Sequence, residues 1–134
     1  MAVATVADLA AHPLFAGLAE PELRELAPCF EARSVGAGVR LVGEGAAGYS
    51  FFLLCDGEAL VTAGGAEVAS LAAGDFFGEL SLLGDGRRQA TVTTTSEARI
   101  LVLFGTDFRR LEAAHPAVAG RIEAAMRERA ATLG

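Results

Sequence analysis

The residues best suited to chemistry lie close together in the second half of the chain. The segment Gly78–Leu83 (GELSLL) is followed by Gly84–Gly86 and then by Arg87 and Arg88. The first turn of any helix has unpaired backbone N–H groups, and a turn that begins at Gly78 would offer them to an anion. The guanidinium of Arg88 would add a planar fork of donors. Together these features predict a phosphate-binding site.

Glu79 lies within the same segment, although a carboxylate repels phosphate. Its position is explained if the ligand also carries a hydroxyl group, because a carboxylate accepts hydrogen bonds. A ribose phosphate supplies both groups. The pair of Glu79 and Arg88 therefore predicts a ligand that contains a sugar phosphate.

The elements that must hold this segment are mainly β. Between Phe30 and Phe104, short runs of β-branched, aromatic and Leu residues are separated by glycines. The chain has 16 Gly, whereas average usage predicts about nine, and the excess indicates many tight turns. Short strands about 8–12 residues apart favour a sandwich or barrel over a parallel α/β sheet. The expected strands are Glu31–Val35, Val39–Val42, Ser50–Cys55, Glu58–Thr62, Glu67–Leu71, Ala90–Thr94 and Arg99–Phe104.

Helices are expected at both ends of the chain. Thr5–Ala11 predicts a short helical turn, and Glu20–Pro28 has Pro21 near its start and acids in its first turn. Near the other end, Thr106 is the expected N-cap of a helix that reaches Ala114. A second helix is expected over about Pro116–Leu133. We therefore expect a single domain over residues 1–134, with an N-terminal helical segment (1–29), a β-roll (30–105) and C-terminal helices (106–134).

The sequence from Phe77 to Val92 resembles the phosphate-binding cassette of cyclic-nucleotide-binding domains. That family has the pattern F-G-E-L-[AS]-L-L, a short spacer and then R-x-A-T-V, which FGELSLL and RQATV match here. Val42–Gly48 resembles the glycine-bracketed turn of the family, Leu54–Val61 its hairpin, and Leu71–Phe77 its lead into the cassette. The resemblance covers about residues 12–133. It implies a mainly β fold with flanking helices: an eight-stranded, jelly-roll-like β-roll with N-terminal helices and a two-helix C-terminal lid.

The resemblance also implies roles for single residues in the cassette. Glu79 would accept a hydrogen bond from the ribose 2′-hydroxyl, beside the Gly78 backbone. Arg88 would pair with the phosphate oxygens, together with the backbone N–H groups of Gln89 and Ala90. Leu80 would lie near the sugar, and the predicted ligand-binding set also includes Ser81.

Further ligand contacts are implied outside the cassette. Val61 and Val68 match the apolar wall beside the base. In the family the last helix closes over the ligand, which makes Met126, Arg129 and Leu133 lid candidates, and we include Arg129 in the predicted site. Many cGMP-preferring members carry Thr or Ser after the clamp arginine, whereas this chain has Gln89. The expected ligand is therefore cAMP, with cGMP as the alternative, and no further cofactor.

Composition excludes several other classes of function. The chain has a net charge of −6 and all 11 of its basic residues are Arg, whereas a nucleic-acid partner calls for clustered positive charge. No run approaches the roughly 18–20 apolar residues of a membrane span, and no secretory signal is visible. We expect no direct binding to nucleic acid, no membrane insertion, and a location in the cytoplasm or on the cytoplasmic side of a membrane protein.

The remaining reactive residues are expected to be structural. Cys29 and Cys55 are too few and too far apart for a zinc site or a disulfide framework, and they are expected to be buried free thiols. His12 and His115 each precede Pro and are expected at turns. Two isolated histidines do not provide the clustered ligands that a cupin-type enzyme needs. Arg87 is expected to face solvent or to pair with Asp85.

The expected function is a regulatory ligand-binding domain, not an enzyme. Binding of a cyclic nucleotide would reposition the C-terminal helix and pass a signal to an effector domain in the same polypeptide or to a partner protein. One alternative is a degenerate β-roll that serves in dimerisation or docking without binding nucleotide, and a homodimer is left open in either case. A transcription regulator would need a helix-turn-helix after the last helix, and this chain ends at Gly134.

Overall fold

The structure, a computed structural model, describes residues 2–42, 50–77 and 90–133. Two antiparallel sheets form a β-roll. The first sheet has the strand order β1-β2-β9-β4-β7, and the second has the order β3-β8-β5-β6. The strands are β1 (Ala2–Val3), β2 (Glu31–Val35), β3 (Arg40–Val42), β4 (Ser50–Asp56), β5 (Glu58–Ala63), β6 (Ala66–Ala72), β7 (Phe76–Phe77), β8 (Thr91–Thr94) and β9 (Ala98–Phe104).

The predicted eight-stranded roll is confirmed in β2 to β9. The structure adds β1, a two-residue strand that pairs with β2 at the edge of the first sheet. The seven strands expected from the sequence pattern agree with the observed ones to within one residue at each end. The eighth strand of the roll, β7, is only two residues long.

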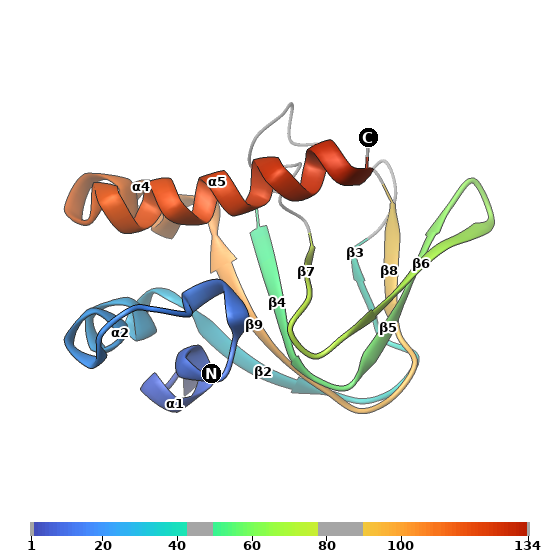
Figure 1. Ribbon diagram of the computed structural model, residues 1–134. Helices are drawn as coiled ribbons and strands as arrows, with labels where there is room; N and C mark the ends of the chain where they lie inside the picture. Colours follow the sequence, from blue (N-terminus) through green and yellow to red (C-terminus); the bar gives the residue numbers. More distant parts are fainter. Residues whose placement is uncertain (1, 43–49, 78–89, 134) are drawn as a thin grey trace.

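The helices lie at the two ends of the chain, as predicted. At the N-terminal end these are α1 (Val6–Ala10), the 3₁₀ turn η1 (Pro13–Phe15), α2 (Glu20–Leu26) and the 3₁₀ turn η2 (Ala27–Cys29). At the C-terminal end, α4 (Gly105–Ala114) and α5 (Pro116–Leu133) follow β9. Figure 1 shows α1, α2 and α4 together on one side of the roll, while α5 extends across its upper end.

The expected N-cap of α4 was wrong. The capping residue is Phe104, whose side chain makes no cap hydrogen bond, and Thr106 lies inside the first turn. The cause is that β9 continues to Phe104, whose ring packs against the interior of the roll. The Arg33 guanidinium lies 5.9 Å from the centre of that ring. The strand therefore leads into the helix without a polar cap.

Two apolar cores share β4 and β9. On one face, Phe51 and Leu53 of β4 pack with Leu101 and Leu103 of β9, the N-terminal helices, α4 and α5. On the opposite face, Phe52 and Leu54 pack with residues of β8 and β9 inside the roll. Successive side chains of a strand point to opposite faces, so an uninterrupted apolar run such as FFLL fills both cores.

Gly57 makes the tight turn between β4 and β5. Its φ is +93°, a value that side-chain-bearing residues rarely adopt. A Cβ atom at this position would lie 2.3 Å from the Glu97 carbonyl oxygen and 2.8 Å from the Ala98 Cα. The β4–β5 connection therefore depends on glycine for both its conformation and its close approach to β9.

Candidate functional site

The predicted phosphate segment runs between β7 and β8 in the sequence. Its residues Gly78, Glu79, Leu80, Ser81, Arg88 and Gln89, together with Arg87, lie outside the described residues. Their predicted roles stay predictions. Ala90 is described: it is half-buried and directly precedes β8. The structure therefore describes the strands that lead into and out of the segment, together with the surfaces around them.

The entry strand β7 is held by two aromatic contacts on opposite faces. Phe76 packs on Phe51 with ring centres 5.5 Å apart, in the core beside the helices. Phe77 stacks on Phe52 at 5.0 Å with the rings nearly parallel, in the core inside the roll. Aromatic pairs at such distances stabilise the fold beyond the area that they bury. These two rings fix β7 against the centre of β4.

The turn before β7 is tied to β4 by backbone hydrogen bonds. The Gly74 N–H donates to the Leu54 carbonyl at 2.9 Å, and the Leu54 N–H donates to the Asp75 carbonyl at 2.8 Å. Gly74 has a φ of +97°, and a Cβ there would meet the Pro13 ring at 3.3 Å. The turn therefore contacts both the roll and the N-terminal segment.

The N-terminal segment contributes a buried histidine to this turn. The Leu14 N–H donates to Nδ1 of His12 at 3.2 Å, so Nε2 carries the proton and donates to the Asp75 carbonyl oxygen at 3.2 Å. Burial lowers the pKa of His12, an effect that its hydrogen bond with Asp75 and the Asp75 charge only partly offset. His12 therefore lies at a turn, as predicted, whereas its contact with Asp75 was not predicted.

The predicted apolar wall lies on the second sheet. Val61 of β5 is half-buried and opposes Val92 of β8, and Val92 also opposes Val42 of β3. Val68 lies in β6 at an irregularity in the β5–β6 register, where one extra residue separates Ala69, opposite Val61, from Glu67, opposite Thr62. Such bulges change the direction of a side chain. Val68 is 60% exposed, so the structure brings Val61 and Val68 to the same region and leaves Val68 on the surface.

Helix α5, the predicted lid, is anchored through its first half. Ala119 and Ile122 of α5 are buried in the core that contains the N-terminal helices. The Arg121 guanidinium also donates to the backbone carbonyl of Ala16. Arg129 falls in the second half of α5, and its side chain, like those of Met126 and Leu133, lies outside what the structure describes. The lid roles of these three residues stay predictions.

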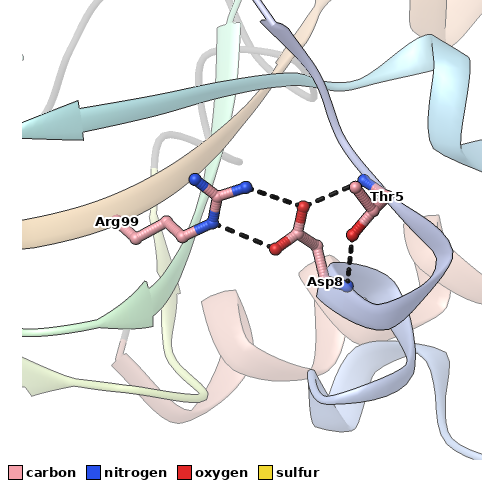
Figure 2. A network of polar contacts seen from close by, with 3 residues as sticks. All are labelled: Thr5, Asp8 and Arg99. Carbon is pink, nitrogen blue, oxygen red and sulfur yellow. Dashed lines mark hydrogen bonds and ion pairs between the residues drawn. The ribbon is translucent and has the colours of Figure 1, made fainter.

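A second polar cluster joins α1 to β9, as Figure 2 shows. The Asp8 carboxylate accepts hydrogen bonds from Nε and Nη2 of Arg99 at 3.0 and 2.9 Å. It also accepts from the Thr5 N–H, while the Thr5 hydroxyl accepts from the Asp8 N–H. The hydrogen bonds from Arg99 are the main reason that the pKa of Asp8 falls to about 2. This cluster was not predicted, although the spacing Thr5-x-x-Asp8 is a known helix-capping pattern.

The remaining candidates for chemistry are structural in the part of the chain that the structure covers. Cys29 and Cys55 are free, as expected, but they are half-buried and not buried as predicted, because each lies at the edge of the core beside the helices. Burial raises the pKa of both thiols, and that of Cys55 reaches about 11, so both are poor nucleophiles. His115 ends α4 and lies 3.4 Å from the Glu25 carboxylate. Among the described residues, no group of three or more potential metal ligands is present.

None of the helices in the described ranges is both long and apolar enough to span a membrane.

Comparison with known proteins places this geometry in a family. Residues 32–115, more than half of the chain, match the sequence profile described as "Cyclic nucleotide-binding domain". A cAMP-dependent protein kinase regulatory subunit of Yarrowia lipolytica is 40% identical over 101 residues, which cover 74% of this chain and 27% of that protein. A cyclic nucleotide-gated potassium channel of Rhizobium etli is 34% identical over 121 residues, which cover 90% of this chain and 34% of the channel.

A solved structure supports the same family relationship. The Thermus thermophilus catabolite activator protein superposes with a TM-score of 0.77 at 34% identity, over 90% of this chain and 60% of that one. The chain spans about a quarter to a third of the length of the two curated relatives described above. These relatives are a regulatory subunit, a channel and an activator, in agreement with the prediction of a binding module instead of an enzyme.

Proposed function

We propose that this chain, which belongs to the cyclic nucleotide-binding domain family, binds cAMP and repositions its C-terminal helix in response. The observation that carries the proposal is the pair of Glu79 and Arg88, which is intact at the family's positions inside the matched residues 32–115. A carboxylate suits the ribose 2′-hydroxyl, and a guanidinium suits the phosphate. A β-roll that had lost nucleotide binding would need neither residue.

The described residues around this segment are consistent with a nucleotide site. Two aromatic pairs, one tilted and one stacked, hold β7 at one end of the segment, and β8 at the other end pairs with both β3 and β5. Val61 and Val68 supply apolar surface to which a purine base could bind. Covering the exposed valine of the bulged edge strand with a flat apolar ligand is favourable, because it removes apolar surface from water.

The preference for cAMP over cGMP rests on Gln89 and on the names of the relatives. Gln89 replaces the short hydroxyl residue that many cGMP-preferring members carry after the arginine. The kinase regulatory subunits at 37–40% identity are named as cAMP-dependent. A ligand of about twenty heavy atoms at about −0.3 kcal/mol per atom gives about −7 kcal/mol, which corresponds to micromolar affinity.

The output of binding is proposed to involve α5. Its first half is anchored in the core through Ala119 and Ile122, so a ligand contact with its second half, which contains Arg129, would bias the direction of the helix. That movement would act on an effector in the same polypeptide or on a partner protein. We propose a cytoplasmic location for the domain, because cAMP is an intracellular signal.

Calorimetric titration with cAMP and cGMP tests the proposal. We expect cAMP to bind in the micromolar range and more tightly than cGMP. Arg88→Ala should weaken cAMP binding by roughly 2–5 kcal/mol, because the phosphate loses its charged partner. Arg87→Ala is the matched control, since it removes the same charge one residue away and should leave the affinity nearly unchanged.

Two results would contradict this proposal. Equal affinity in the wild type and Arg88→Ala would exclude the assigned role of Arg88. The absence of any cAMP-induced rise in the melting temperature at millimolar ligand would favour a β-roll that serves only in dimerisation or docking.

A further inference from the structure

His12 occupies a buried position between the N-terminal segment and the turn that precedes β7. Its side chain is only 3% exposed, and its ring lies edge-on to Phe15 at a centre-to-centre distance of 6.2 Å. Both ring nitrogens have partners: Nδ1 accepts from the Leu14 N–H and Nε2 donates to the Asp75 carbonyl, each at 3.2 Å. The His12 ring therefore joins two segments that are 63 residues apart in the sequence.

These partners allow only one form of the ring. A backbone N–H can only donate, so the Nδ1 atom that faces Leu14 must be unprotonated. A carbonyl can only accept, so the Nε2 atom that faces Asp75 must carry hydrogen. A second proton on Nδ1 would place two donors against each other at a buried position. The observed arrangement is therefore built for neutral imidazole.

The Asp75 carbonyl is the point at which the turn is held. It accepts from the Leu54 N–H on one side and from His12 on the other. Phe76, the first residue of β7, follows at once, and within the described residues two residue pairs join β7 to β4. The turn at Asp75 therefore acts together with the two aromatic contacts of β7 to set the direction in which the chain enters this strand.

We propose that His12 is a positioning residue for ligand binding: the neutral ring holds the Asp75 carbonyl and thereby fixes how the chain enters β7. The inference rests on the proposed function, because Gly78 and the predicted phosphate segment directly follow β7 in the sequence. When the turn is held in advance, the ligand does not have to order it. If the turn is free, part of the binding energy is used to order it and the apparent affinity falls.

Several titratable groups lie around His12. The Asp75 carboxylate lies in the same turn, and Asp8 of α1, held by Arg99 of β9, lines the same cavity as His12. The Cys55 thiol of β4 also lines this cavity and is neutral because its pKa is about 11. This cavity of about 190 Å³ beside the ring is lined by Asp8, Cys55 and Ala73 among others, and a protonated ring could move into it.

The direction of the pH effect follows from burial. Because the pKa of His12 is lowered in the folded chain, the contact is complete above the ordinary histidine value of about 6.5 and is increasingly disfavoured as the pH falls below it. Affinity for cAMP should therefore decrease between pH 7.5 and pH 5.5. The ordinary carboxylate range lies below this window.

Two substitutions separate the roles of the ring nitrogens. In His12→Asn the amide oxygen can replace Nδ1 and cap the turn at Leu14, but the side chain is too short to reach Asp75. In His12→Gln the amide N–H can replace Nε2 and donate to Asp75. By calorimetry at pH 7.5 we expect His12→Asn to bind cAMP about fivefold more weakly than the wild type, the effect of one net hydrogen bond. His12→Gln should keep wild-type affinity, and both variants should lose the decrease at pH 5.5.

The chain contains one other histidine, which provides the control. His115→Gln should keep the wild-type affinity and the wild-type pH profile, because His115 contacts Glu25 on α2. The inference is overturned if His12→Asn keeps both the affinity and the pH profile of the wild type, or if His12→Gln binds as weakly as His12→Asn.

A measurement without ligand separates this inference from the proposed function. In the unliganded chain, the amides of Leu54 and Gly74 should exchange with deuterium severalfold faster in His12→Asn than in His12→Gln or the wild type. If that difference is seen but the wild type binds no cAMP, the proposed function fails while the positioning of the turn stands. Equal exchange in all three proteins would overturn the positioning role, whatever binds.

Discussion

The ion pair of Asp8 and Arg99 provides a quantitative prediction for Asp8→Asn. Asparagine keeps the shape of the side chain, and its one oxygen can still accept from the Thr5 N–H and from Nη2 of Arg99. Its NH2 group replaces the oxygen that accepts from Nε of Arg99, so the substitution removes the charge and one of the two Arg99 hydrogen bonds. The pKa of Asp8 falls from 3.8 to about 2, which would correspond to about 2.4 kcal/mol at about 1.36 kcal/mol per unit. Arg99 is 38% exposed, and solvent screening reduces this figure. We expect a loss of about 1–2 kcal/mol at pH 7.

The pH dependence of stability gives the same prediction a second test. Unfolded Asp8 binds a proton more readily than folded Asp8, so between pH 3.8 and about 2 the unfolded chain holds more protons. The contribution of the ion pair is therefore complete above pH 3.8 and is lost as the pH falls to about 2. In this window the stability of Asp8→Asn should change less with pH than that of the wild type.

Urea denaturation followed by circular dichroism, at pH 7 and at several values between pH 2 and pH 5, measures both effects. Glu112→Gln, which removes one negative charge from an exposed position on α4, is the control for net charge and should change the free energy of unfolding by less than about 0.5 kcal/mol. Equal stability of Asp8→Asn and the wild type at pH 7, with parallel curves in acid, would refute the reasoning.

Two other substitutions test the fold and the predicted wall. Gly57→Ala should lower the free energy of unfolding by about 2–4 kcal/mol, because the new Cβ would lie 2.3 Å from the Glu97 carbonyl oxygen in a backbone conformation that alanine rarely adopts; a loss below about 0.5 kcal/mol in urea titration would contradict this. Val68→Ser should weaken cAMP binding about fivefold, from lost apolar contact with the base, at almost unchanged stability. Val3→Ser, at a similarly exposed valine (61% against 60%), is its control, and equal binding by the two variants would count against a role of Val68 in the wall.

The sequence predicted the architecture well wherever an element was long enough to show a pattern. Three kinds of signal were sufficient to predict these elements: the apolar runs in β4 and β9, the glycines between strands and the prolines at helix starts. The two-residue strands β1 and β7 were missed as strands, because two residues cannot show an alternation. The cap of α4 was misplaced because the half-buried Phe104 ring, and not Thr106, determines where the strand becomes a helix.

The sequence alone supports a prediction of site residues only where their pattern is local. Glu79 and Arg88 are nine positions apart in the sequence, and their family pattern is contiguous enough to identify, a resemblance that the match over residues 32–115 confirms at the level of the family. The contacts of His12 with Asp75 and of Asp8 with Arg99 join residues that are 63 and 91 positions apart. No local pattern predicts which residues the folded chain brings together over such separations.

The two-sided burial of β4 and β9 has a consequence for strand register. In most half-buried strands a slip by one residue moves apolar side chains into water, and this penalty selects the correct pairing. In the FFLL run of β4 a slip would exchange one apolar face for another, so polarity gives little discrimination between registers. The selection must come from shape: Phe52 stacks on Phe77 in only one register, and the Gly57 turn fits against Glu97 and Ala98 in only one register. Substitutions at Phe52 or Gly57 should therefore promote mispaired folding intermediates, in addition to any loss of apolar burial in the folded chain.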